Sequence, residues 1–182
     1  MQALSTEALT GLPPAAAQDV TQYMVWLLRE SLGGDSAGVI SDATLLCLVE
    51  AGCRTEADVR ALGPEAVAAL PAAAANEVAE FLVRLLRESL DLPALISGET
   101  LRSLAQAGCR TKDAVQALST EALTAFPPAA AQAVKQYLVL LLRGSLGRLS
   151  GIILSDATLL GLVEAGCRTR PDVWTLGTEV VA

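Results

Sequence analysis

The sequence contains no histidine, and aromatic residues make up only 3% of its 182 positions. It also has no Gly-rich phosphate loop after a strand and no Cys-x-x-Cys pair. Histidines, paired carboxylates and thiols supply most general acids, bases, nucleophiles and zinc ligands. We therefore expect no enzymatic activity, no cofactor and no metal site.

Basic residues are in the minority, with 13 Lys and Arg against 20 Asp and Glu and a formal net charge of −7. Nucleic-acid affinity depends mainly on clustered cations, so we expect no nucleic-acid partner. No apolar run reaches the roughly 18–20 residues that span a bilayer, so no transmembrane segment is expected. The first residues lack a basic region followed by an apolar run, which predicts no signal or transit peptide.

What the sequence does contain is small and aliphatic residues, since 52% of the chain is hydrophobic while aromatic residues are few. Ala and Leu have high helix propensity, and Ala lets helix backbones approach closely. An apolar fraction of this size also argues against disorder. Composition therefore predicts an ordered, all-α fold.

The chain repeats itself. Residues 2–68 align without a gap with residues 116–182, and about 47 of the 67 pairs are identical. A weaker copy lies between them, because Ala-Gly-Cys-Arg-Thr at 51–55 returns at 107–111 and at 165–169. We predict a tandem, solenoid-like array of about three four-helix units of roughly 57 residues. The expected divisions are a partial unit at 1–37, units at 38–93 and 94–150, and a partial unit at 151–182.

Capping signals predict four helices in each unit. In the first whole unit, Ser41 caps a helix that Gly52 closes in a left-handed conformation, and Thr55 caps a helix of two turns at most. Gly63 starts another short helix, and Pro71 starts a long one with a broad apolar stripe. The equivalent starts and stops elsewhere are Ser5, Pro13, Ser97, Gly108, Thr111, Ser119, Pro127, Ser155, Gly166, Thr169 and Gly177.

Cysteine and arginine recur at fixed places. One equivalent position holds Cys53, Cys109 and Cys167, and such positions lie farther apart than the roughly 5.5–6 Å Cα separation of a disulfide. We expect small buried thiols, which favour a reducing intracellular compartment. Cys47 differs, because its counterpart is Gly161. The arginines of the repeated motif are candidates for ion pairs between helices or units: Arg54, Arg110 and Arg168.

Residues 48–70, which carry this motif, resemble the helix-hairpin-helix superfamily, whose small domains share a SAM-like fold of four or five helices. The resemblance recurs in all three copies and implies compact helical units and, in the family, DNA binding. The family holds a DNA phosphate at a Gly-x-Gly turn, which is replaced here by residues 70–73, Leu-Pro-Ala-Ala. Proline removes the backbone donors that a phosphate needs. Extended α-solenoids of the armadillo or mesothelin-like kind are the alternative.

The copies differ most informatively at the tryptophans. Trp26 aligns with Arg84 and Leu140, so one position is apolar in two copies and charged in the third. Trp174 likewise aligns with Arg60 and Gln116. An exposed Trp is a common anchor of protein interfaces, although Trp26 could instead pack on a neighbouring unit. The candidate interaction surface comprises Trp26, Leu140, Trp174, Tyr23 and Tyr137.

These features predict a non-enzymatic helical-repeat scaffold or structural subunit that mediates protein–protein interaction within a larger assembly. The partner would be another protein or a neighbouring repeat array, so self-assembly is expected as well. One alternative is a carrier of an apolar ligand, such as a lipid or a pigment, between helices. Another is an array of DNA-binding hairpins, which the acidic charge disfavours.

Overall fold

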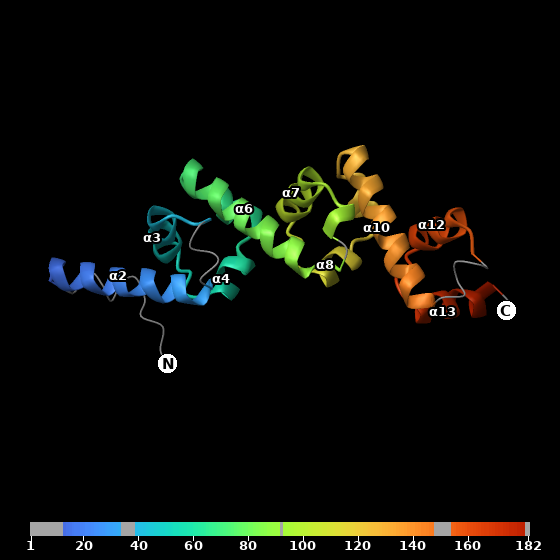
Figure 1. Cartoon of the computed structure of the whole chain (residues 1–182), viewed down its shortest axis with the longest axis horizontal. Coiled ribbons are helices and arrows are strands. Elements are labelled where there is room, and N and C mark those ends of the chain that lie inside the picture. Colours follow the sequence, from blue (N-terminus) through green and yellow to red (C-terminus); the bar gives the residue numbers. More distant parts are fainter. Residues whose placement is uncertain (1–12, 34–38, 92, 148–153, 181–182) are drawn as a thin grey trace. The chain divides into compact units, whose positions relative to one another are not determined.

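The computed structural model of this chain describes residues 13–33, 39–91, 93–147 and 154–180 (Figure 1). In these ranges the regular structure is helical throughout, with eleven α-helices and no strand, so the all-α prediction is confirmed. Contacts divide the chain into two units, Met1–Arg84 and Leu85–Ala182, and the division falls inside a helix. The short helix predicted after Ser5 and the joints around residues 37 and 150 lie outside the described residues.

The unit Met1–Arg84 contains a long helix followed by three shorter ones and most of a second long helix. They are α2 (Pro14–Ser31), α3 (Asp42–Glu50), α4 (Glu56–Ala61), α5 (Pro64–Ala68) and α6 (Ala72–Ser89). Helix α2 packs against α3. Buried leucines and valines on successive helices form the core: Leu28, Leu45, Leu48, Val59 and Val78.

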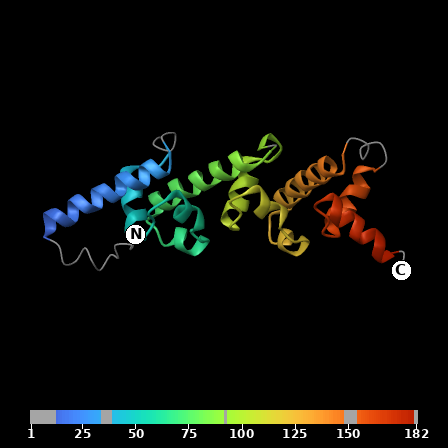
Figure 2. The same cartoon turned by 90° about the horizontal axis from the view of Figure 1, so that it is seen from below.

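The unit Leu85–Ala182 is built around one long helix. Its elements are η2 (Pro93–Leu95), α7 (Gly98–Gln106), α8 (Lys112–Gln116), α9 (Thr120–Thr124), α10 (Pro128–Leu146), α12 (Asp156–Glu164) and α13 (Arg170–Val180). Helix α10, orange in Figure 2, packs against α7 and α9, which precede it in the sequence. It also packs against α12 and α13, which follow it. Its buried residues include Val134, Tyr137, Leu138 and Leu142.

The predicted Ser and Thr helix starts are confirmed at α3, α4, α7 and α12. The side chain of Ser41 accepts a hydrogen bond from the backbone N–H of Thr44, and Ser97 and Ser155 do the same at the starts of α7 and α12. Thr55 and Asp58 form a complete capping box at α4. These bonds satisfy amide groups that have no partner inside the helix.

The repeated Ala-Gly-Cys-Arg-Thr motif is a helix C-cap joined to the next N-cap. Gly52 has a φ of +92°, which an L side chain rarely adopts, and the Cys53 N–H donates to the Leu48 carbonyl at 2.9 Å. Gly52 N–H donates to the Val49 carbonyl at 3.1 Å, which completes a Schellman motif. The left-handed glycines and the buried cysteines predicted from the sequence are confirmed at all three joints.

The last copy corrects one prediction. The sequence predicts a short helix after Thr169 and another from Gly177, but α13 continues unbroken to Val180. In the first copy Pro64 disfavours helical backbone at the residue before it, and in the middle copy the Ser119 hydroxyl caps a new helix. Gly177 has neither a following proline nor a capping side chain, so the helix has no local reason to stop there.

In the described part of the chain, no helix has the length and apolar character that crossing a membrane requires.

Candidate interaction surface

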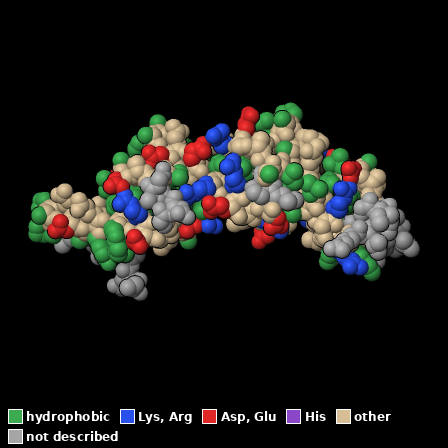
Figure 3. Space-filling view, viewed as in Figure 1, with side chains coloured by type: hydrophobic (Ala, Val, Ile, Leu, Met, Phe, Trp, Pro, Cys, Tyr) green, Lys and Arg blue, Asp and Glu red, His purple; other side chains and the backbone are tan. Residues whose placement is uncertain are grey.

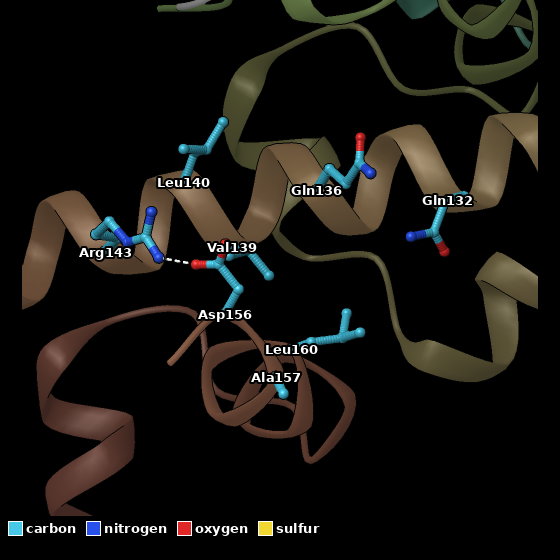
Figure 4. A pocket seen from close by; sticks show the side chains of 8 residues that line it. All are labelled: Gln132, Gln136, Val139, Leu140, Arg143, Asp156, Ala157 and Leu160. Carbon is cyan, nitrogen blue, oxygen red and sulfur yellow. Dashed lines mark hydrogen bonds and ion pairs between the residues drawn. The ribbon is translucent and has the colours of Figure 1, made fainter. Parts of the chain in front are cut away.

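A groove lies between α10 and α12, with a volume of about 380 Å³ (Figure 4). Arg143 reaches from α10 to form an ion pair with Asp156 at the start of α12. At the other end of α12, Lys135 Nζ lies 2.7 Å from Glu164 Oε1. Two ion pairs thus join the ends of α12 to α10. The groove is lined by Gln132, Gln136, Val139, Leu140, Arg143, Asp156, Ala157 and Leu160.

The same residues recur on α2 and α3. Of the eight lining positions, seven are identical in the first copy, and the eighth is Trp26 in place of Leu140. The ion pair recurs too, between Arg29 and Asp42. The positions are Gln18, Gln22, Val25, Trp26, Arg29, Asp42, Ala43 and Leu46.

The tryptophan makes this first-copy surface more apolar. Trp26 is 50% exposed, and its ring stacks on that of Tyr23 with the centroids 5.8 Å apart. Leu46 on α3 is exposed as well. Figure 3 shows hydrophobic side chains at the surface in the region of α2. Exposed apolar patches mark interaction sites, and Trp and Tyr are enriched among the residues that anchor protein interfaces.

The middle copy carries charge at the corresponding positions. Arg84 stands in the place of Trp26, and Arg102 stands in the place of Leu46 and Leu160. The apolar lining is therefore restricted to the two nearly identical copies. Sequence reasoning missed Leu46 and Leu160. A signal was available, because their shared position is leucine in two copies and arginine in the third, just as the position of Trp26 is apolar in two copies and charged in the third.

The predicted surface residues do not all belong to this groove. Leu140 lines it and is half-buried, while Tyr23 borders its counterpart on α2. Trp174 is 67% exposed on α13, where the Arg170 guanidinium carbon lies 5.6 Å from its ring centroid. This tryptophan is not among the residues that line the groove.

Tyr137 corrects the prediction, because its side chain is only 1% exposed. Burial and the nearby Asp91 carboxylate raise the pKa of its hydroxyl, while Lys112 acts in the opposite direction. Tyr137 thus faces the start of α8 and contributes to the core. Its counterpart Phe81 on α6 is also buried, so on both α6 and α10 this aromatic residue belongs to the buried apolar stripe of the long helix.

The motif arginines donate hydrogen bonds to carbonyl oxygens of their own joints. Arg54 Nη1 donates to the carbonyls of Val49 at 2.6 Å and Cys53 at 2.9 Å. A carbonyl near a helix C-terminus has no intrahelical donor, so the guanidinium supplies one. Arg110 donates to the equivalent pair of carbonyls in the middle copy.

Arg168 makes the same two bonds and adds two more. Its Nη1 donates to the carbonyls of Val163 at 2.6 Å and Cys167 at 3.0 Å. Nε donates to the Gln116 carbonyl at 3.1 Å, and Nη2 donates to the Leu118 carbonyl at 2.9 Å. One side chain therefore ties the α12–α13 joint to the connection between α8 and α9.

Comparisons of the chain with protein-family models, with curated proteins and with solved structures found no match. Function is therefore inferred from the residues themselves. The groove offers aliphatic side chains flanked by two primary amides and by an arginine already paired with aspartate. Such a lining is suited to binding an apolar group with polar edges.

Proposed function

We propose that the chain is a tandem array of four-helix units that acts as a non-enzymatic scaffold or structural subunit. It binds a protein partner through the groove between α10 and α12 and through the matching surface of α2 and α3. One observation carries the proposal: two distant parts of the sequence share seven of eight groove residues, and the eighth is the half-exposed Trp26.

The recurrence of local structure supports the array. The Ser caps, the left-handed glycines and the buried cysteines occur in the same order in all three copies. In Leu85–Ala182 the short helices α7 and α9 pack on the long helix α10. Units that bury their apolar faces on such neighbours are typical of repeat proteins that bind partners along a surface.

The partner is expected to place an apolar side chain against Trp26 and Leu46. Both residues are exposed, and the Arg29–Asp42 ion pair beside them leaves little net charge on the lining. Gln18 and Gln22 add amide donors and acceptors along the edge. An apolar segment with polar flanks, such as one face of an amphipathic helix, has matching chemistry.

Site-specific photocrosslinking tests the proposal. Benzoylphenylalanine placed at position 26 or 46, in the cell that makes the protein, is expected to capture the same protein from both positions. Position 102 is the matched control, because it is the exposed, charged counterpart of Leu46. No adduct from positions 26 and 46, or equal adducts from position 102, contradicts the proposal. A lipid or pigment extracted from the native protein but absent from Trp26→Arg indicates an apolar-ligand carrier instead.

A further inference from the structure

The negative charge of the chain belongs to one of its two units. The unit Met1–Arg84 holds 11 Asp and Glu against 4 Lys and Arg, which accounts for the entire net charge of −7. The unit Leu85–Ala182 holds nine residues of each sign and is neutral. The two nearly identical apolar surfaces lie in different units, with α2 and α3 in the first and α10 and α12 in the second. Their electrostatic surroundings therefore differ.

The difference begins on the long helices themselves. On α2 the exposed Asp19 and Glu30 stand where α10 has Ala133 and Gly144. Helices α2 and α3 together carry four carboxylates and one arginine, whereas α10 and α12 carry two carboxylates and two cations. Two surfaces that share seven of eight lining residues are thus bordered by different charge.

The helices that follow show the same contrast. Glu164 on α12 is balanced by Lys135, whose Nζ lies 2.7 Å from Glu164 Oε1. Its counterpart Glu50 on α3 is exposed, and Thr21 stands in the place of Lys135. The Thr21 hydroxyl donates to the Ala17 carbonyl at 2.9 Å, so position 21 brings no cation to Glu50. We call the three carboxylates that border the first-copy surface its acidic rim: Asp19, Glu30 and Glu50.

On α2 the rim encloses the aromatic pair. Asp19, Tyr23, Trp26 and Glu30 follow one another at i, i+4, i+7 and i+11, which places them on one face of the helix. All four are exposed, and the two rings stack with their centroids 5.8 Å apart. The face extends over three turns, or about 16 Å at a rise of 1.5 Å per residue. It presents an aromatic centre with a carboxylate at each end.

We propose that the α2–α3 surface binds a basic amphipathic helix, in which Lys or Arg residues flank an apolar stripe. Trp26 and Leu46 receive the apolar side chains, and Glu50, one turn beyond Leu46, continues the acidic rim on α3. The basic flanks of the partner lie against the rim carboxylates, and an Arg there also stacks over an exposed ring. Apolar contact supplies the affinity, and the charges select the partner.

This inference rests on the proposed function and adds a partner class to it. It also separates the two surfaces, because the balanced charges of α10 and α12 give that groove no preference for a basic partner. The first copy therefore discriminates by charge, and the last copy discriminates by apolar fit alone.

Two synthetic helical peptides test the charge preference on the whole chain. They share one leucine stripe and differ only in their flanks, which are lysine in one peptide and glutamate in the other. Trp26 fluorescence in the Trp174→Phe protein reports binding at this surface, because the sequence contains only these two tryptophans. At low salt the lysine peptide is expected to bind at least about tenfold more tightly than the glutamate peptide. Added salt should reduce this difference, because it screens exposed charges.

A matched pair of charge reversals locates the attraction. Glu30→Lys reverses a rim charge, whereas Glu65→Lys reverses an exposed carboxylate on α5, outside the rim. Glu30→Lys is expected to weaken binding of the lysine peptide about tenfold, and Glu65→Lys is expected to change it less than about twofold. Thr21→Lys recreates beside Glu50 the cation of the last copy and should also weaken binding of the lysine peptide. Circular dichroism verifies that each variant keeps its helix content.

The outcomes separate this inference from the proposed function. If both peptides change the Trp26 fluorescence with equal affinity, the surface binds apolar helices without regard to charge, so the proposed function stands and the inference is overturned. If neither peptide binds, both are contradicted. Equal weakening by Glu30→Lys and Glu65→Lys shows attraction by the net charge of the unit rather than by the rim, which also overturns the inference. The comparison of the two peptides uses the native rim, so it does not depend on the folding of any rim variant.

Discussion

Replacing Arg168 by methionine is expected to loosen α12 and α13 more than the matched change Arg54→Met loosens α3 and α4. Methionine retains much of the aliphatic length and removes the guanidinium. Both arginines donate to two carbonyls of their own joint, so this part of the loss is shared. Arg168 alone also loses the bonds to Gln116 and Leu118.

The difference can be worked from these two additional bonds. A hydrogen bond from a charged donor contributes a net of roughly 1.5–3 kcal/mol. Arg168 is only half-buried, and bonds that share one side chain do not add fully, so we take about 2 kcal/mol for the pair. This corresponds to about a thirtyfold rise in the local opening constant of α12 and α13.

Hydrogen exchange measured by mass spectrometry resolves the two joints in one chain. In Arg168→Met the amides of α12 are expected to exchange about thirtyfold faster, beyond the change that Arg54→Met produces in α3. Arg168→Lys should recover only part of the protection, because one ammonium cannot reach carbonyls in several directions. Equal changes in the two methionine variants would refute the role assigned to the additional bonds.

Three further predictions concern single positions. Gly166→Ala is expected to destabilise the fold by about 1–2 kcal/mol because the φ of Gly166 is +92°. Gly161→Ala, inside α12 with open space around the position, should stabilise the fold by about 0.5–1 kcal/mol. Thermal unfolding of both variants shows whether each change raises or lowers the stability. Hydrogen bonds from the backbone N–H of Arg168 and from Thr169 lower the pKa of Asp172 below its ordinary 3.8. The ionised Asp172 carboxylate therefore contributes fully to stability above about pH 5, and this contribution is lost as the pH falls through the lowered pKa. The destabilisation caused by Asp172→Ala should accordingly disappear at low pH, and a loss that does not vary with pH contradicts the assignment. Burial raises the pKa of the three motif thiols, so the half-buried Cys47 should react first with a thiol reagent in the native protein, and Cys47→Gly should remove the fast phase.

Features predicted correctly from the sequence depend on atoms a few residues apart. Ser41 caps the helix that begins one residue later, and Gly52 takes a positive φ at its end, because those bonds join residues within six positions of one another. The burial of Cys53 follows from the same local turn, which directs the residue after the glycine back toward the helix. Short-range geometry of this kind is encoded by residue type and spacing.

Contacts between distant segments escaped the same reasoning. The groove exists because α12 packs on α10; comparison of the copies identified Leu140 on α10, but not Leu160, which the packing of α12 brings to the same groove. Tyr137 and Tyr23 occupy equivalent positions in the sequence, yet one is buried and the other exposed. Arg168 binds carbonyls about fifty residues away, which no local pattern predicts.

The sequence by itself determined the all-α class, the Ser and Thr helix starts, the glycine stops, and the recurrence of one joint in three places, because each depends on backbone bonds closed within a turn or two. Only the tertiary structure decided which copies of an apolar residue are covered. Burial depends on the element that packs against a residue, so identical residues acquire different environments when the described elements around them differ.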